Sequence, residues 1–216
     1  VNRALETLVL RLSGDAQALQ SPALAALRND PQQIISRYGY ETDGQLRLLV
    51  EFDPISTERI LRQAGLALWG SNRPAILAWW LNDSTEGSTL VADAQPAAAL
   101  LRNAAERSGL PLRLPLGDLD EQLLANAENL TAAQPDALLP ASARYNADAL
   151  LAVQARETAG QWQAQWQLWL GDNREQGSAQ GADQQALADA VLQAVSMRLA
   201  PRFVSQPGAA QALQVQ

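Results

Sequence analysis

The stretch ADALLAVQARETAGQWQAQWQLWL, residues 147–170, decides the fold class. Its first part, 147–156, is almost continuously apolar and predicts a buried strand, and the following residues 158–160 predict a turn. From Gln161 onward, glutamines alternate with tryptophan, alanine and leucine, as in a strand that buries one face. The stretch therefore predicts a strand hairpin in the C-terminal half of the chain.

A long amphipathic segment follows this hairpin. Residues 182–203 place Leu187, Val191, Val195 and Leu199 on one stripe and predict the longest helix of the chain. The polar, Gln- and Gly-rich residues 172–180 before the helix predict a loop or a mobile hairpin tip. The Gly-, Ala- and Gln-rich end of the chain, residues 205–216, predicts a flexible tail.

Strand and helix patterns alternate in the middle of the chain. Apolar runs bounded by turn residues predict strands at 75–81, 89–92 and 110–116, and longer periodic segments predict helices at 96–109 and 137–145. Together these patterns predict an α/β (α+β) fold. Its expected parts are a mixed sheet with flanking helices, a C-terminal strand hairpin and a long closing helix.

The front of the chain carries a different pattern. Helices are predicted at 5–12, 21–28 and 56–65, and two strands at 34–40 and 46–52 are predicted around an Asp-Gly turn. The second strand would place Leu46, Leu48, Val50 and Phe52 on one face. We therefore expect a helix and hairpin subdomain over residues 1–67, an α/β domain packed on it over 68–204, and the tail over 205–216.

Three residue types are missing, and their absence bears on function. The chain has no cysteine, no histidine and no lysine, so its 16 basic residues are all arginine. Zinc and copper sites, Ser-His-Asp and Cys-His catalysis, Schiff bases and P-loop lysines all need one of these residues. We therefore predict no catalytic residues, no metal, no cofactor and no enzyme activity.

Charge and hydropathy restrict the partners. The net charge is −7 and the isoelectric point is about 4.6, which argues against nucleic acid because neutralising phosphates takes clustered positive charge. No apolar run is long enough for a transmembrane helix in the sequence shown. The oligomeric state is left open.

The candidate binding residues cluster in the stretch 68–74. A surface built from Trp69, Gly70, Asn72, Arg73 and Pro74 would offer a flat aromatic face beside a guanidinium suited to carboxylates or phosphates. The alternative is a structural junction, in which the glycine and proline shape a turn and the tryptophan lies in the core. We favour the junction on turn chemistry and keep the stretch as the best binding candidate.

The remaining tryptophans form the second candidate. Trp79 and Trp80 are adjacent and must point to opposite faces of a strand. With Trp162, Trp166 and Trp169, they could form an aromatic groove for a glycan or a peptide, although such residues more often fill a core.

One carboxylate cluster could in principle bind a divalent cation or act in hydrolysis. Asp118, Asp120 and Glu121 follow a Pro-Leu-Gly turn, but they lack the spacing of a calcium loop. Acidic residues at the start of a helix favour its dipole, so helix capping is the preferred interpretation.

The order of these pieces resembles the DUF2066 proteins of Gram-negative bacteria over residues 1 to about 203. The segments that carry the resemblance are Arg11-Leu12-Ser13-Gly14, Tyr38-x-Tyr40, Leu46 to Phe52 with Asp53-Pro54, Leu68-Trp69-Gly70-x-Asn72-Arg73-Pro74, Gly109-Leu110-Pro111, Leu114-Pro115-Leu116, Ala143 to Ala149 and Gly160-x-Trp162-x-Ala164-x-Trp166. The helix and strand-turn-strand module is also loosely similar to the TolB N-terminal domain and to CsgG.

DUF2066 has no established function, so the resemblance implies a location more than a chemistry. Its members look like exported envelope proteins, which implies a periplasmic protein whose signal peptide was removed before Val1. We therefore expect a non-catalytic binding or assembly module for another cell-envelope protein, acting around Trp69, Asn72, Arg73 and the edge of the 149–170 hairpin. The alternative is a small-ligand or glycan binder with a Trp-lined site.

Overall fold

The computed structural model describes residues 1–43, 45–70 and 72–205, and the chain separates into two units. Unit 1 comprises Val1–Asn72 together with the residues from Leu199 onward, and unit 2 comprises Arg73–Arg198. The fold class expected from the sequence is confirmed: helices accompany a mixed sheet, with a C-terminal strand hairpin and a long last helix. The predicted tail lies outside the described residues except for Ser205, as do Gly44 and Ser71.

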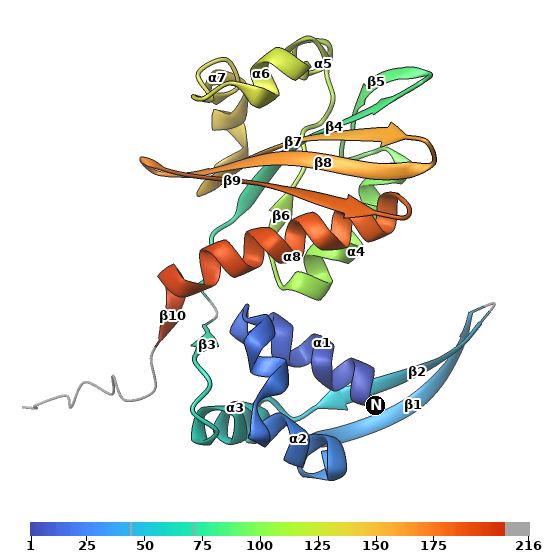
Figure 1. Cartoon of the computed structure of the whole chain (residues 1–216), viewed down its shortest axis with the longest axis vertical. Coiled ribbons are helices and arrows are strands. Elements are labelled where there is room, and N and C mark those ends of the chain that lie inside the picture. The colour runs from blue at the N-terminus through green and yellow to red at the C-terminus, as the bar shows by residue number, and fades with distance from the viewer. Residues whose placement is uncertain (44, 71, 206–216) are drawn as a thin grey trace, which may run out of the picture. The chain divides into compact units, whose positions relative to one another are not determined.

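Unit 1 consists of short helices and a separate hairpin (Figure 1). Its elements are α1 (Asn2–Ser13), η1 (Ala16–Gln20), α2 (Pro22–Asn29), η2 (Pro31–Gln33), β1 (Ile35–Asp43), β2 (Gln45–Phe52), α3 (Pro54–Gln63), β3 (Leu68–Trp69) and β10 (Val204–Ser205). β1 and β2 pair antiparallel, and β10 pairs antiparallel with β3.

Local sequence signals determine where the helices of unit 1 begin and end. Gly14 ends α1 in a left-handed conformation, and the Ser21 side chain accepts a hydrogen bond from Leu24 N at the start of α2, as expected. α3 begins two residues before the prediction, because Asp53 caps it and Pro54 takes the first helical position. The helices bury an apolar core formed by Leu5, Val9, Ala18, Leu24, Leu27, Ile34, Leu61 and Leu68.

Unit 2 is a mixed sheet with helices on both faces. Its elements are β4 (Ile76–Ser84), β5 (Gly87–Leu90), α4 (Pro96–Ser108), β6 (Leu112–Arg113), α5 (Leu119–Leu124), α6 (Ala127–Thr131), α7 (Leu139–Ser142), η3 (Ala143–Tyr145), β7 (Ala149–Thr158), β8 (Gln161–Leu170), β9 (Asn173–Gly181) and α8 (Gln184–Phe203), the last residues of α8 belonging to unit 1. The strand order is β5-β4-β7-β8-β9, and β6 pairs with β4. β4 runs parallel to β6 and β7, and the other pairs are antiparallel.

The two faces of this sheet are covered by different helices (Figure 1). One face, which we call the α4/α8 face, carries Trp80 and Trp162 against α4 and the start of α8. The other, the α5–α7 face, carries Trp79 and Trp169 against the chain around α5, α6 and α7. Trp79 and Trp80 thus point to opposite faces, as strand alternation requires.

Three predicted elements of unit 2 differ from the structure. Residues 172–180 were expected as a loop or a mobile hairpin tip, but all of them except Asp172 lie in the edge strand β9, because hydrogen bonds to β8 outweigh the weak strand preference of glutamine and glycine. The strand expected at 110–116 shrinks to β6, since Pro111 and Pro115 cannot donate ladder hydrogen bonds. The helix expected at 137–145 is the shorter α7 followed by the 3₁₀ turn η3.

Gly181, at the end of β9, touches the first turns of α8. A Cβ atom at this position would lie 2.3 Å from Leu187 N, a backbone atom that cannot rotate away. We expect Gly181→Ala to lower the unfolding free energy by about 1–3 kcal/mol, measured by urea denaturation. Gly39→Ala, where nothing lies within 4 Å of the new methyl group, is the control. Equal stability of the two variants would contradict this prediction.

Candidate functional site

The tryptophan of the predicted binding stretch does not present its ring to solvent. Trp69 lies in β3 with 3% of its surface exposed, and its ring stacks on Phe203 with centroids 6.4 Å apart. Gly70 and Asn72, which follow it, are exposed. The aromatic face expected for recognition is therefore used inside unit 1, where it packs against the end of α8.

The rest of that stretch belongs to unit 2. Arg73 is half-buried, and its Nη1 donates a hydrogen bond of 2.5 Å to the carbonyl oxygen of Gly109, the residue that ends α4. Pro74 is buried. The contact gives Arg73 a structural role in holding the C-terminus of α4. A binding role for Asn72 and Arg73 stays a prediction.

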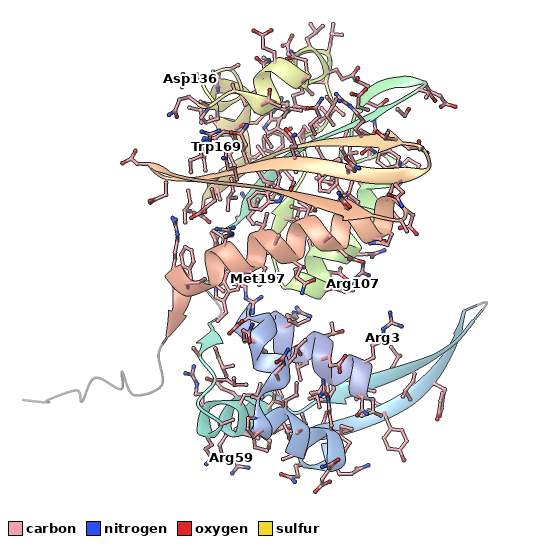
Figure 2. The ribbon with its side chains drawn as sticks, in the orientation of Figure 1. Arg3, Arg59, Arg107, Asp136, Trp169 and Met197 are labelled. Carbon is pink, nitrogen blue, oxygen red and sulfur yellow. The ribbon has the colours of Figure 1, made fainter. Side chains whose placement is uncertain are left out.

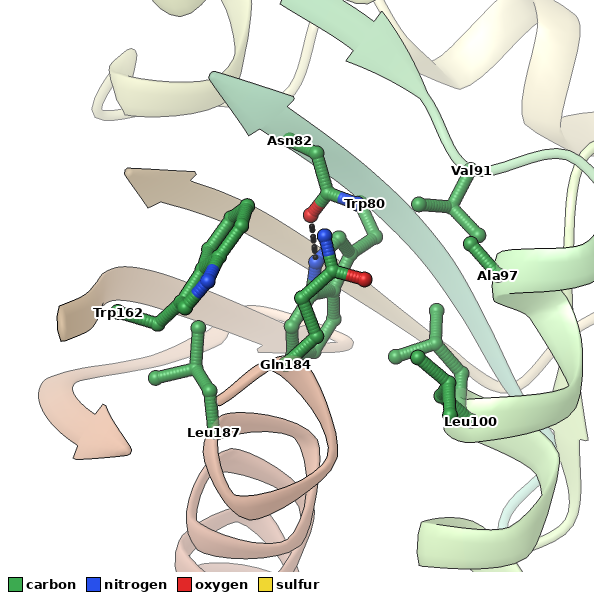
Figure 3. Close-up of a pocket in the computed structure, with 9 residues that line it drawn as sticks. Trp80, Asn82, Val91, Ala97, Leu100, Trp162, Gln184 and Leu187 are labelled. Carbon is green, nitrogen blue, oxygen red and sulfur yellow. Dashed lines mark hydrogen bonds between the residues drawn. The ribbon is translucent and has the colours of Figure 1, made fainter. Parts of the chain in front are cut away.

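Trp162 lines a pocket that also contains a second tryptophan, Trp80 (Figure 3). The indole Nε1 of Trp80 donates a hydrogen bond of 2.9 Å to Asn82 Oδ1, and Gln184 lies at the rim. The cavity measures only about 10 Å³, which is about the space of one water molecule. A sugar ring or a peptide side chain does not fit here.

Trp166 is buried on the same face of β8 as Trp162. Its ring lies across Gly177 of β9, where an added Cβ atom would sit 2.4 Å from Cζ2 of the indole. Trp169, an odd number of residues away, points to the other face of the sheet and packs in the cluster around Trp79. These tryptophans and the pair Trp79 and Trp80 are thus divided between the two faces of the sheet, and they do not form the common groove considered from the sequence.

The edges of the 149–170 hairpin are also covered. β7 pairs along one side with β4, and β8 pairs along the other side with β9. The hairpin, expected to offer an open edge, is thus internal to the sheet. The prediction was wrong because it took the residues of β9 for a loop.

The carboxylate cluster around Glu121 forms a structural joint. Asp118 and Glu121 make a capping box at the start of α5, which confirms the capping interpretation. Glu121 is 1% exposed and accepts hydrogen bonds from Arg144, from Tyr145 Oη at 2.5 Å and from Gly117 N at 2.6 Å. All its acceptor capacity is directed into the protein, so the cluster leaves no free carboxylate pair for acid–base chemistry.

The pKa values in this joint follow from its contacts. Burial alone would raise the pKa of Glu121, but hydrogen bonds from Arg144, Tyr145 and Gly117 outweigh burial and lower it. Burial and the bond to Glu121 raise the pKa of Tyr145, so its hydroxyl stays protonated and donates. Among the described residues, no group of three or more acidic side chains is placed to hold a metal ion.

The β1–β2 hairpin carries an exposed apolar surface that was not among the candidate sites predicted from the sequence. It extends away from the helices of unit 1 (Figure 1), and it forms a sheet of only two strands. Tyr38 and Tyr40 are 64% and 70% exposed, and Leu48 and Leu49 are also exposed. The alternation of apolar residues predicted one shared face for the second strand, but it did not predict whether that face is exposed.

The register of the hairpin arranges these residues on its two faces. Tyr38 pairs with Val50 and Tyr40 with Leu48, so these apolar side chains share one face. Leu49 lies opposite Gly39 on the other face. We call the exposed residues Tyr38, Tyr40, Leu48 and Leu49 the hairpin patch. The Tyr-x-Tyr spacing places both tyrosines on one face of the strand, but it does not tell whether that face is exposed.

Comparisons with known proteins support a family for the front of the chain only. The family model of a domain of unknown function, DUF8605, matches residues 1–70, a segment that ends two residues before the division of the chain after Asn72. No curated protein and no solved structure matches the chain.

The resemblance to DUF2066 is therefore wrong, since the matching family is DUF8605. It relied on short segments such as 68–74, and glycine, asparagine and proline recur at turns of unrelated proteins for conformational reasons. The looser similarity to TolB and CsgG domains also finds no support in the comparisons. Separately, none of the helices in the described part of the chain is long and apolar enough to span a membrane.

Proposed function

We propose that this protein is a non-catalytic binding module that contacts a partner protein through the hairpin patch. The observation that carries the proposal is the exposure of two tyrosines and two leucines on a projecting two-stranded sheet. Tyrosines are enriched among the residues that dominate binding energy at protein interfaces, and exposed apolar patches mark such interfaces.

The backbone of the hairpin supports the same function. Each of its strands has one outer edge without a neighbouring strand in the described part of the chain. Such an edge offers unpaired N–H and C=O groups to an extended segment of a partner. The base of the hairpin is anchored because Ile34 and Phe52 pack in the unit 1 core. The base of the hairpin is therefore held in place, while Tyr38, Tyr40, Leu48 and Leu49 remain exposed.

Photocrosslinking in cells tests this proposal. A benzophenone amino acid is placed at position 40 of the full-length protein, and in a matched control at position 55, where Ile55 is 78% exposed on α3 of the same unit. We expect position 40 to capture one defined protein that position 55 does not capture.

Substitutions in the hairpin patch measure how much it contributes to the affinity for the partner. We expect Tyr38→Ser together with Tyr40→Ser to weaken binding of the purified, captured partner by about 30-fold or more, because a tyrosine at the centre of an interface contributes about 2 kcal/mol. Ile55→Ser should leave the affinity unchanged. Equal capture from both positions, or a crosslink only to residues 73–198 of the same chain, would overturn the proposal.

The location of the partner is a separate proposal. A periplasmic protein that binds another envelope component was expected from the DUF2066 resemblance, which has lost its basis. We retain the envelope as the compartment to test, because the cysteine-free chain is compatible with an oxidising compartment. Fractionation of the same crosslinked cells decides it, since recovery of the adduct in the cytoplasm would reject this location.

A further inference from the structure

A cleft of about 750 Å³ opens at one end of the sheet of unit 2. Its walls are the amino ends of β4 and β7, the carboxyl end of β8, the turn before β9 and the chain between Gln134 and Asp148. The volume lies within the range of small-molecule sites, about 300–1,000 Å³. This cleft is separate from the hairpin patch, which lies in unit 1.

The inner wall of the cleft is apolar and aromatic. Leu77, Leu150 and Trp169 line it, and all three are buried members of the cluster around Trp79. Trp169 is held in place by a long hydrogen bond of 3.4 Å from its Nε1 to the carbonyl oxygen of Ala133. Figure 2 shows Trp169 and Asp136 at the same end of the sheet. An aromatic wall with carboxylates near it suits a cation that carries an apolar group.

The rim of the cleft is predominantly negative. Asp136, Asp148 and Asp172 line it together with a single basic residue, Arg174. Arg174 offsets only one of the three negative charges, and its guanidinium donates to the amide oxygens of Gln167 and Gln176, so the rim keeps a net negative charge.

Two of these aspartates keep their carboxylates available. Asp148 accepts a hydrogen bond of 2.7 Å from Ala75 N. The carboxylates of Asp136 and Asp172 make no hydrogen bond or ion pair with any residue that the structure describes. They are therefore free to receive donors from a ligand, and an anionic ligand would be repelled.

We propose that this cleft binds a small organic cation, with its ammonium group at Asp136 and Asp172 and its apolar part against Trp169 and Leu150. The proposal does not depend on the hairpin patch, because the two sites lie in different units. A neutral glycan would not need the two free carboxylates, and a bare metal ion would not need the apolar wall.

Three probes of nearly equal size and different charge test the proposal on the purified full chain. Benzylammonium, benzyl alcohol and benzoate share the aromatic ring, and their dissociation constants are measured by NMR titration. We expect benzylammonium to bind at least about tenfold more tightly than benzyl alcohol, because hydrogen bonds between two charged groups are stronger than those with a neutral partner. Benzoate should bind most weakly, and added salt should weaken only the benzylammonium complex.

Variants of the rim decide whether the cleft is the site. We expect Asp136→Asn together with Asp172→Asn to reduce benzylammonium affinity to that of benzyl alcohol. Asp120→Asn, an exposed aspartate of α5 outside the cleft, is the matched control and should bind as the unmodified protein does. Equal binding of the three probes, or an equal loss in the control variant, would overturn the proposal. Because neither variant touches unit 1, partner capture at the hairpin patch should persist in both.

Discussion

Replacing Glu121 with alanine is expected to destabilise unit 2 by about 2–4 kcal/mol, because part-buried donors lose their acceptor. The guanidinium of Arg144 contributes less, since its side chain is 44% exposed and it keeps its ion pair with Asp118. The substitution removes the acceptor for Arg144, Tyr145 Oη and Gly117 N at once, in a side chain that is fully buried. Urea denaturation followed by tryptophan fluorescence measures the loss of stability. The signal reports mainly on unit 2, because five of the six tryptophans lie there and only Trp69 lies outside it.

The same carboxylate predicts how stability depends on pH. The pKa of Glu121 is lowered in the folded protein, so its charged form stabilises the fold at pH values above the unfolded pKa of about 4.3. This contribution is lost as the pH falls through the lowered folded pKa. The stability difference between the unmodified protein and Glu121→Gln should therefore be largest near neutral pH and shrink below about pH 4.

An exposed glutamate provides the control for both experiments. Glu128 lies on α6 and is exposed, so Glu128→Ala and Glu128→Gln should each change stability by less than about 0.5 kcal/mol. If Glu121→Ala were no more destabilising than Glu128→Ala, the joint around Glu121 would not stabilise the fold.

Replacing Trp79 with alanine is expected to lower the free energy of unfolding by about 3–5 kcal/mol, through loss of buried contacts and the cavity left behind. Trp79 is fully buried at the centre of the α5–α7 face of the sheet, and its Nε1 donates a hydrogen bond of 3.0 Å to Ser142 Oγ on α7. Urea denaturation followed by circular dichroism measures the loss of stability, because this signal does not depend on the fluorescence of the tryptophan that was removed.

Phenylalanine at the same position separates packing from hydrogen bonding. Trp79→Phe keeps most of the buried ring and removes the N–H donor, so we expect a smaller loss of about 1–2 kcal/mol. If the unfolding free energy of Trp79→Ala were within about 1 kcal/mol of that of the unmodified protein, packing around Trp79 would not stabilise the α5–α7 face.

Neither proposed site could be predicted from the sequence, and the physical reason differs between the two. The exposure of Tyr38 and Tyr40 could not be predicted, because alternating apolar residues look the same whether a strand faces a core or solvent. The cleft brings Asp136 to Trp169 and Asp172, which lie more than 30 residues further along the chain, and no local pattern connects the two segments. Trp69, in contrast, was considered both as a recognition residue and as a core residue, and the structure places it in the core.

The sequence by itself determined the elements whose signals are local. Gly14 and Gly109 end helices in the left-handed conformation, Ser21 and Asp118 cap helices, and alternation defines β8, because each of these effects acts within a few residues along the chain. Only the tertiary structure decided that residues 173–181 form an edge strand and that the tryptophans of β8 lie on opposite faces of a covered sheet. Strand pairing and burial depend on partners far away in the sequence, and a single chain read residue by residue does not specify those partners.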